Sequence, residues 1–174
     1  MRKVILNLAV SLDGYIARED GRVDWLDNLD TDGNDLGFVT FLDQCDTILS
    51  GRIAYEVTMK LGNGVWPFAD KKTFVFTEGI YANTNNIEFT YNNPKKVVNR
   101  LKNVPGKDIW LFGGSGLISS MRELDLVDEY IITTIPVMLG KGIKLFQSID
   151  KETTLELISI EKCNSIIQTH YKRV

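Results

Sequence analysis

Residues 109–118, with the sequence IWLFGGSGLI, place four apolar residues directly before three glycines within four positions. The apolar run is typical of a buried strand, and the spacing of Leu117, Ile118, Met121 and Leu124 is typical of a helix. Glycines at such a junction let the backbone approach a ligand closely, and the first turn of the helix offers unpaired N–H groups that suit a phosphate. The alternative is a tight strand-to-helix turn that binds nothing.

A second junction of the same kind occurs at residues 48–52, with the sequence ILSGR. A short glycine pattern that occurs once is weak evidence for a ligand site. Its recurrence favours the binding interpretation, and we predict that the two turns hold one ligand between them in a shared cleft.

The composition excludes several classes of protein. We expect one domain over residues 1–174, because a chain of this length with 44% hydrophobic residues can bury a substantial core. A net charge of −3 makes nucleic acid an unfavourable partner. Cys45 and Cys163 are far apart and His170 is the single histidine, which argues against a disulfide framework or a metal cluster. The sequence has neither a signal peptide nor an apolar run of about 18 residues, so we expect a cytoplasmic protein that does not enter membranes.

Predicted strands and helices alternate up to residue 124, and strands dominate afterwards. The predicted strands lie at residues 4–10, 15–17, 47–50, 72–77, 87–91, 109–112, 127–135, 143–146, 154–163 and 165–172. The predicted helices lie at residues 35–44, at 53–61, from Asn93-Pro94 to a stop at 103–106, and from the glycine turn to Leu124. This order predicts an α/β fold with a mainly parallel central sheet flanked by helices and an antiparallel C-terminal hairpin. Residues 18–34 form a long predicted loop of a kind that is usually functional or mobile.

Four motifs in a fixed order point to a known family. They are SLDGYIA at 11–17, SGR at 50–52, FGGSG at 112–116, and LGKG at 139–142 followed by Phe146. The order resembles the dihydrofolate reductase-like fold, and more closely the C-terminal reductase domain of the riboflavin-biosynthesis deaminase–reductase in a stand-alone form. The resemblance covers nearly the whole chain. It implies a homodimer and NADPH-dependent reduction of a small nitrogen heterocycle such as 5-amino-6-(5-phosphoribosylamino)uracil. The zinc signature of the deaminase half is absent.

The resemblance also implies how NADPH would be held, because the G-x-G-x-x-G fingerprint is missing after the first strand. Gly51 would open a helix beneath the phosphates, Arg52 would bind the 2′-phosphate, and Thr77 would lie near the adenosine. The alternative for Arg52 is a surface cation near a helix start, and Ala54 replaces a hydroxyl residue that many relatives carry. The other implied cofactor-binding residues are Gly113, Gly114, Ser115, Gly116 and Leu117 at the second turn, and Ala9, Gly14 and Ile16 around the nicotinamide ring.

The same resemblance implies a cis peptide bond between Gly113 and Gly114. A cis bond without proline costs roughly 3–4 kcal/mol, so it persists only where a surrounding site fixes it.

Two carboxylates are candidates for the catalytic proton donor. Asp13 ends the first strand beside the proposed nicotinamide site, although Asp-Gly is also a common turn pair. Asp35 starts a predicted helix at a spacing similar to that of the substrate-binding carboxylate of dihydrofolate reductases, and Thr133 matches its threonine partner there. An aspartate is also ordinary at a helix start.

Trp25 and Tyr55 are candidate walls of a pocket for a flat heterocycle, with plain core packing as the alternative. Lys141 is either a contact for an anionic substrate or an exposed loop lysine. Two other functions stay open, namely reduction of a pterin or folate, favoured if Asp35 lies in the pocket, and nucleotide binding without catalysis.

Overall fold

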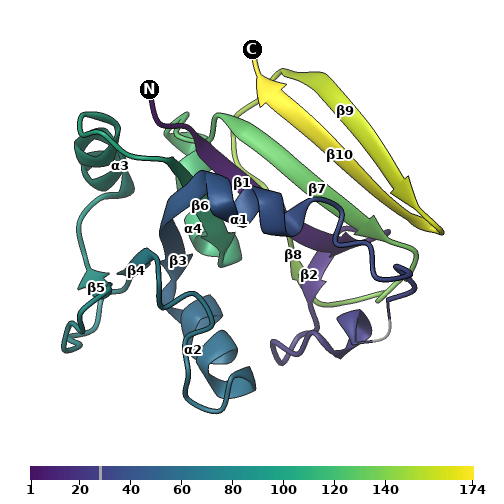
Figure 1. Cartoon of the computed structure of the whole chain (residues 1–174), viewed down its shortest axis with the longest axis horizontal. Coiled ribbons are helices and arrows are strands. Elements are labelled where there is room, and N and C mark those ends of the chain that lie inside the picture. The colour runs from purple at the N-terminus through teal and green to yellow at the C-terminus, as the bar shows by residue number, and fades with distance from the viewer. Residues whose placement is uncertain (28) are drawn as a thin grey trace.

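The computed structural model describes residues 1–27 and 29–174, and its centre is an eight-stranded sheet in the order β5-β4-β3-β6-β1-β7-β10-β9 (Figure 1). The strands of this sheet are β1 (Val4–Ser11), β3 (Cys45–Gly51), β4 (Lys72–Phe76), β5 (Ile87–Thr90), β6 (Asp108–Gly113), β7 (Glu129–Ile135), β9 (Leu155–Cys163) and β10 (Ile166–Arg173). A separate antiparallel pair joins β2 (Tyr15–Ala17) to β8 (Ile143–Lys144). No helix in residues 1–27 and 29–174 is long and apolar enough to span a bilayer.

Within the eight-stranded sheet, the six strands from β5 to β7 run parallel, and the terminal hairpin of β9 and β10 pairs antiparallel. β10 pairs antiparallel with β7 and with β9, whereas β1 pairs parallel with both β6 and β7. The predicted α/β fold with a mainly parallel sheet and an antiparallel C-terminal hairpin is therefore confirmed.

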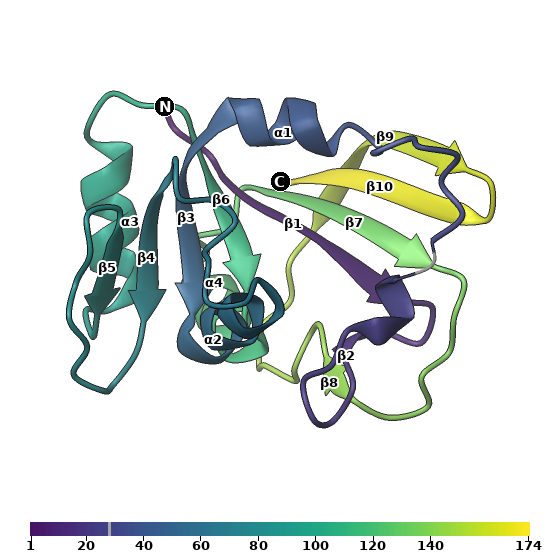
Figure 2. The ribbon, with the colours of Figure 1, turned by 60° about the horizontal axis from the view of Figure 1, so that its bottom comes forward.

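Helices cover both faces of the sheet, as a buried parallel sheet requires. They are α1 (Phe38–Gln44), α2 (Arg52–Leu61), α3 (Pro94–Lys102) and α4 (Ser115–Glu123), with a short 3-10 turn η1 at Asp24–Leu26. α3 and α4 bury Val98, Ile118 and Met121 in one cluster against β1, β3 and β6. α1 and α2 lie on the other face (Figure 2). They pack Phe41 and Tyr55 into a second cluster, in which Trp110 is buried.

The start of α1 corrects the sequence prediction. The predicted helix over 35–44 begins only at Phe38, because Leu36 and Gly37 have φ values of 49° and 73° and so cannot continue a right-handed helix. Asp35 lies just before this turn. Its carboxylate accepts hydrogen bonds from the backbone N–H groups of Gly37 (3.0 Å) and Val39 (2.8 Å), and so it caps the helix from outside.

The parallel arrangement brings the two glycine-bearing turns together. β3 and β6 are neighbours in the sheet, and Ser50 lies opposite Gly113 in their register. Since parallel strands end at the same edge, the first turns of α2 and α4 emerge side by side. β1 lies next to β6, so residues 7–9 extend the same edge toward β7.

Candidate active site

The turns after β3 and β6 touch through their glycines. A Cβ atom added to Gly114 would lie 3.3 Å from the Cα of Gly51, and one added to Gly51 would lie 3.5 Å from the carbonyl oxygen of Gly113. Gly113 and Gly114 have φ values of 145° and 90°, which L side chains rarely adopt. The contact of two backbones is therefore possible because glycine stands at each position.

The predicted cis peptide between Gly113 and Gly114 is wrong. All peptide bonds between described residues are trans. The chain reverses through the positive φ values of the two glycines instead, and this gives the turn without an energetically costly peptide isomer.

The helices that follow the two turns leave their first N–H groups without side-chain partners. Neither Gly51, before α2, nor Gly114, before α4, caps its helix with a side chain. By contrast, Asn93 caps α3 by accepting a hydrogen bond from the N–H of Lys95. Two uncapped helix starts that meet at one point give a region of positive potential suited to an anion.

A single cavity of about 1560 Å³ opens at this point and crosses the sheet edge from β4 to β7. Both glycine turns line it. One end is walled by Arg52, Thr77 and Tyr81 with residues 90–94, and the other by Leu36, Thr133 and Gln168. Ligands of open α/β sheets occupy such crevices at the carboxyl ends of the strands.

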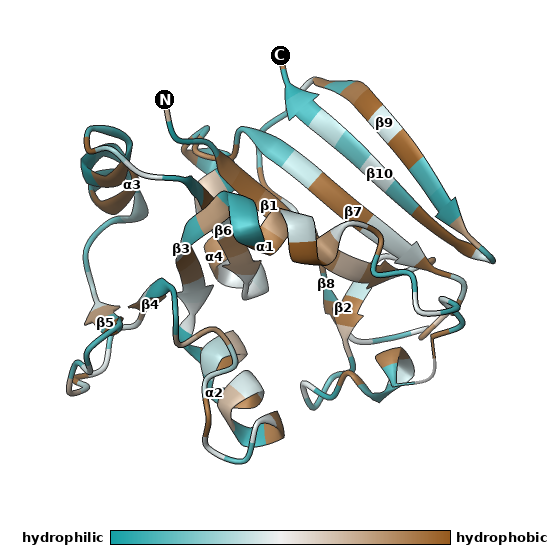
Figure 3. Cartoon of the chain, viewed as in Figure 1, coloured by the Kyte–Doolittle hydropathy of each residue, from teal (hydrophilic) through white to brown (hydrophobic). Residues whose placement is uncertain are grey.

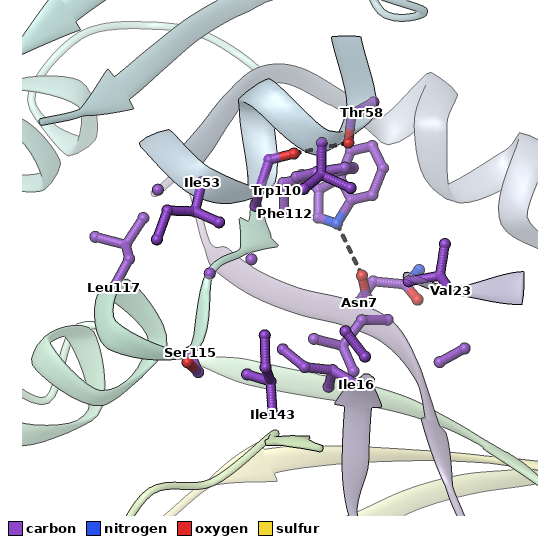
Figure 4. Close-up of a pocket in the computed structure, with 18 of the residues that line it drawn as sticks. Asn7, Ile16, Val23, Ile53, Thr58, Trp110, Phe112, Ser115, Leu117 and Ile143 are labelled. Carbon is purple, nitrogen blue, oxygen red and sulfur yellow. Dashed lines mark hydrogen bonds between the residues drawn. The ribbon is translucent and has the colours of Figure 1, made fainter. Parts of the chain in front are cut away.

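The cavity contains most of the predicted site residues. Those among its lining are Ala9, Ile16, Asp35, Gly51, Arg52, Thr77, Gly113, Gly114, Ser115, Gly116, Leu117 and Thr133. Figure 4 shows Ser115 and Leu117 at the start of α4, with Ile16 and Ile143 across the cavity from α2.

The end of the cavity near β7 is apolar with a few placed polar groups. Ala9, Ile16 and Leu36 give its walls, and Gln168 Nε2 donates a hydrogen bond to Thr133 Oγ1 at 2.9 Å. The indole N–H of the buried Trp110 donates to the backbone carbonyl of Asn7 at 3.0 Å, as the dashed line in Figure 4 marks. An apolar cleft with a few fixed polar groups suits a flat heterocycle.

Asp13 and Gly14 do not line the cavity. Asp13 accepts hydrogen bonds from Ser11 Oγ (2.6 Å) and from the N–H groups of Leu139 (3.1 Å) and Gly140 (2.7 Å). These bonds, with that from Ser11 the largest contribution, lower the pKa of Asp13 below its ordinary value. The carboxylate therefore joins the turn after β1 to the loop that leads to β8.

Trp25 and Tyr55 also lie outside the cavity lining. Tyr55 packs against Trp66 and Phe89, with ring centroids 5.1 Å and 5.5 Å away, and burial raises its pKa. Trp25 packs against the third hydrophobic cluster, around Leu36 and Ile166. Both aromatic rings thus pack as core residues, the alternative that the sequence left open.

Two other residues named in the sequence analysis, Lys141 and His170, interact with acidic neighbours. Lys141 forms an exposed ion pair with Glu19 at 3.0 Å. His170 Nε2 lies 3.0 Å from the carboxylate of Glu129, away from the cavity lining.

Several residues in or beside the cavity were not predicted from the sequence. Glu56 forms an ion pair with Arg52, and the four-residue spacing on one helix was the available signal. No signal in the sequence pointed to the other three, Asn7, Tyr81 and Gln168. Their positions at the cavity depend on the strand register and on the path of a loop.

Comparisons with known proteins agree with this architecture. The family model of the RibD C-terminal domain matches residues 58–169. The YwjB protein of Bacillus subtilis (strain 168) is 40% identical over 173 residues, covering 99% of this chain and 98% of its own. A crystal structure from Shewanella sp. PV-4, assigned to riboflavin biosynthesis, has a TM-score of 0.84 at 28% identity and covers 100% of this chain and 99% of its own.

Two more distant structures share the fold. The deaminase/reductase of Thermotoga maritima superposes with a TM-score of 0.74 at 18% identity, and the match covers 99% of this chain and 57% of that one. The dihydrofolate reductase of Enterococcus faecalis, complexed with NADP(H), has a TM-score of 0.66 at 19% identity, with 98% and 96% of the two chains covered. From the family model and the close relative, the chain belongs to the RibD C-terminal domain family, a family of reductases with the dihydrofolate reductase-like fold.

Proposed function

We propose that the protein is an NADPH-dependent reductase of a small nitrogen heterocycle, most like the 5-amino-6-(5-phosphoribosylamino)uracil reductase of riboflavin biosynthesis. The observation that supports it is the contact of the two glycine turns at the centre of one cavity. This contact places two uncapped helix starts beside a single elongated space, which is the shape and polarity that a dinucleotide needs.

The residues present fit this cofactor. Gly51 and Gly114 let the two turns lie in contact, because an added Cβ at either position would meet the other turn. The first turns of α2 and α4, held together in this way, offer N–H donors for the pyrophosphate. Arg52 and Thr77 would hold the adenosine end, and Ala9 and Ile16 would frame the nicotinamide. The bound cofactor supplies a hydride, while the protein orients the two reactants and excludes water.

The substrate would lie against the apolar end of the cavity. Gln168 donates to Thr133 Oγ1, so the hydroxyl hydrogen of Thr133 is available to a heterocyclic acceptor. The Asp35 carboxylate is fixed by two backbone N–H groups and suits an acceptor for a ring N–H. Its place in the cavity lining is the observation that favours the second candidate function, reduction of a pterin or folate.

Two measurements test the proposal. Binding of NADPH to the pure protein is followed by fluorescence and by melting temperature, and a ligand at 100 times its dissociation constant stabilises the fold by about 2.7 kcal/mol. Oxidation of NADPH is then followed by the loss of its near-ultraviolet absorbance, with the phosphoribosylaminouracil and with dihydrofolate in parallel. Binding without turnover of either substrate supports a non-catalytic nucleotide-binding protein, and no binding at all refutes the proposal.

A further inference from the structure

The cation at the adenosine end of the cavity already has an anionic partner. Arg52 Nη1 lies 2.7 Å from Glu56 Oε2, one helical turn further along α2. This pairing raises the pKa of Arg52, with the hydrogen bond from the guanidinium to Glu56 as the largest cause. Among the described residues that line the cavity, Arg52 is the one cation.

The carboxylate of Glu56 is held at a second point. Its Oε1 accepts a hydrogen bond from the hydroxyl of Tyr81 at 3.3 Å. The ring of Tyr81 is stacked on Phe89, with centroids 4.8 Å apart and planes at 17°. Glu56 does not itself line the cavity, but both of its partners, Arg52 and Tyr81, do. The bond from Tyr81 therefore holds Glu56 beside the cavity even when Arg52 turns to another anion.

This arrangement acts differently on the two nicotinamide dinucleotides. A 2′-phosphate that binds Arg52 must share the guanidinium with Glu56 and lies close to a like charge. A ribose 2′-hydroxyl meets no such repulsion, and a carboxylate beside it can accept its hydrogen bond. The Arg52 and Glu56 side chains are 40% and 44% exposed, so water and salt moderate the effect without removing it.

We propose that Glu56 is a specificity-determining residue that limits the preference of this protein for NADPH over NADH by competing for Arg52. The inference rests on the proposed dinucleotide site and adds the residue that sets its selectivity. It concerns the ratio of two affinities, and so it stands or falls separately from the identity of the reduced substrate.

The test compares Glu56→Gln with a matched control, Glu88→Gln. Glu88 also pairs with basic side chains, Lys72 at 3.4 Å and Arg100 at 3.5 Å. Neither of these two cations lines the cavity, whereas Arg52, the partner of Glu56, does. Dissociation constants for NADPH and NADH are measured by fluorescence titration for both variants and for the natural protein. We expect Glu56→Gln to tighten NADPH by about fivefold and to leave NADH within about twofold, with the gain falling at about 0.5 M salt.

Two further variants make the outcomes decisive. Arg52→Ala, alone and combined with Glu56→Gln, should abolish the gain, because the phosphate then has no guanidinium to bind. Melting temperatures of all variants confirm that each is folded. If the dinucleotides bind and Glu56→Gln leaves their affinity ratio unchanged or lowers it, this inference is overturned while the proposed function stands. If neither dinucleotide binds to the natural protein or to any variant, both are overturned.

Discussion

At the scale of single residues, Gly114 shows how a turn can be specified by the absence of a side chain. Its φ of 90° lies where L side chains are strained, and an added methyl group would approach the Cα of Gly51 to 3.3 Å. Both the turn and the inter-turn contact therefore depend on this position.

We expect Gly114→Ala to destabilise the fold by about 1–3 kcal/mol through backbone strain. For a chain of this size that corresponds to a fall in melting temperature of roughly 2–4 °C per kcal/mol, measured by calorimetry. NADPH binding should weaken in parallel, because the two helix starts would be forced apart.

Gly116→Ala is the matched control for stability. An added Cβ at Gly116 meets nothing within 4 Å, and the residue lies inside α4. Alanine is favoured over glycine in a helix by roughly 1 kcal/mol, so this variant should be as stable as the natural protein or more so. Equal melting temperatures for the two variants would contradict the argument from Gly114.

The two candidate carboxylates call for separate tests. Asp13→Asn should depress turnover and leave NADPH affinity nearly intact. Because Asp13 lies outside the cavity and its pKa is lowered, we expect it to act through its bonds to Leu139 and Gly140, which position the loop that leads to Ile143 in the cavity wall. A pH dependence of the rate that is the same in the variant and in the natural protein supports this positioning role, whereas a dependence that the variant loses supports proton donation.

Asp35→Asn should instead raise KM for the heterocycle. The fixed carboxylate would be replaced by a neutral amide, and the hydrogen bond that it accepts from a ring N–H would become weaker. Steady-state kinetics with saturating NADPH measure this change. An unchanged KM would remove Asp35 from substrate binding and weaken the pterin alternative.

At the scale of elements, strand β9 departs from simple alternation. Ile158 has no partner on β10, because the register shifts between His170 and Tyr171. The bulge takes Ile158 out of the pairing, so that Leu157 lies opposite Tyr171 and Ser159 opposite His170. Figure 3 shows hydrophobic segments along β9, where Leu155, Leu157, Ile158 and Ile160 are all exposed.

We propose that a second copy of this chain covers the exposed apolar side chains of β9, since a contiguous apolar surface of this kind marks an interface. Sedimentation should give a dimer at micromolar concentration, and Ile160→Lys, at a side chain 61% exposed, should shift it to monomer. Ile80→Lys is the control, because Ile80 is fully exposed far from β9 in the sequence and outside any strand. A natural protein that sediments as a monomer at all concentrations would refute the dimer.

Periodicity predicted most of the elements, because each buried strand and amphipathic helix leaves a local pattern. The hairpin of β9 and β10, with Asn164 in its turn, follows from alternation and a turn residue. The start of α1 did not follow, since the left-handed Leu36 is favoured by its burial in the third cluster rather than by its own conformational preference.

At the scale of the whole molecule, Glu129 links the two ends of the chain. Its carboxylate forms an ion pair with Lys3 Nζ at 2.7 Å and lies 3.0 Å from His170 Nε2. Burial alone would raise the pKa of Glu129, but the hydrogen bonds from Lys3 and His170 outweigh it and lower the pKa below its ordinary value.

A carboxylate whose pKa is lower in the folded state stabilises the fold above its unfolded pKa, and this contribution is lost as pH falls. We expect Glu129→Gln to lower the free energy of unfolding by about 1–3 kcal/mol at pH 7 and by less near pH 3, measured in urea. Glu161→Gln, at an exposed position of β9, should change stability little at either pH. A difference between Glu129→Gln and the natural protein that does not shrink on acidification would contradict this assignment.

The cavity residues that belong to the glycine-bearing turns could be predicted from the sequence. The residues whose position depends on tertiary packing could not. The local sequence predicts a strand-to-helix turn at Gly51 and Arg52 and another at residues 113–117. All of these residues line the cavity. Asp13 and Tyr55 carry suitable chemistry, but local hydrogen bonds hold the first in a loop and aromatic neighbours hold the second in the core.

The order of the strands has a consequence for how such a molecule can change. β1 sits between β6 and β7, so residues 51–94 build one end of the cavity and residues 7–38 and 133–168 build the other. Mutations can thus accumulate in the stretches that build one end of the cavity without changing those that build the other end. The residues at one end of the cavity can therefore diversify while those at the other end stay as they are, and a library of variants confined to one stretch would show this in the laboratory.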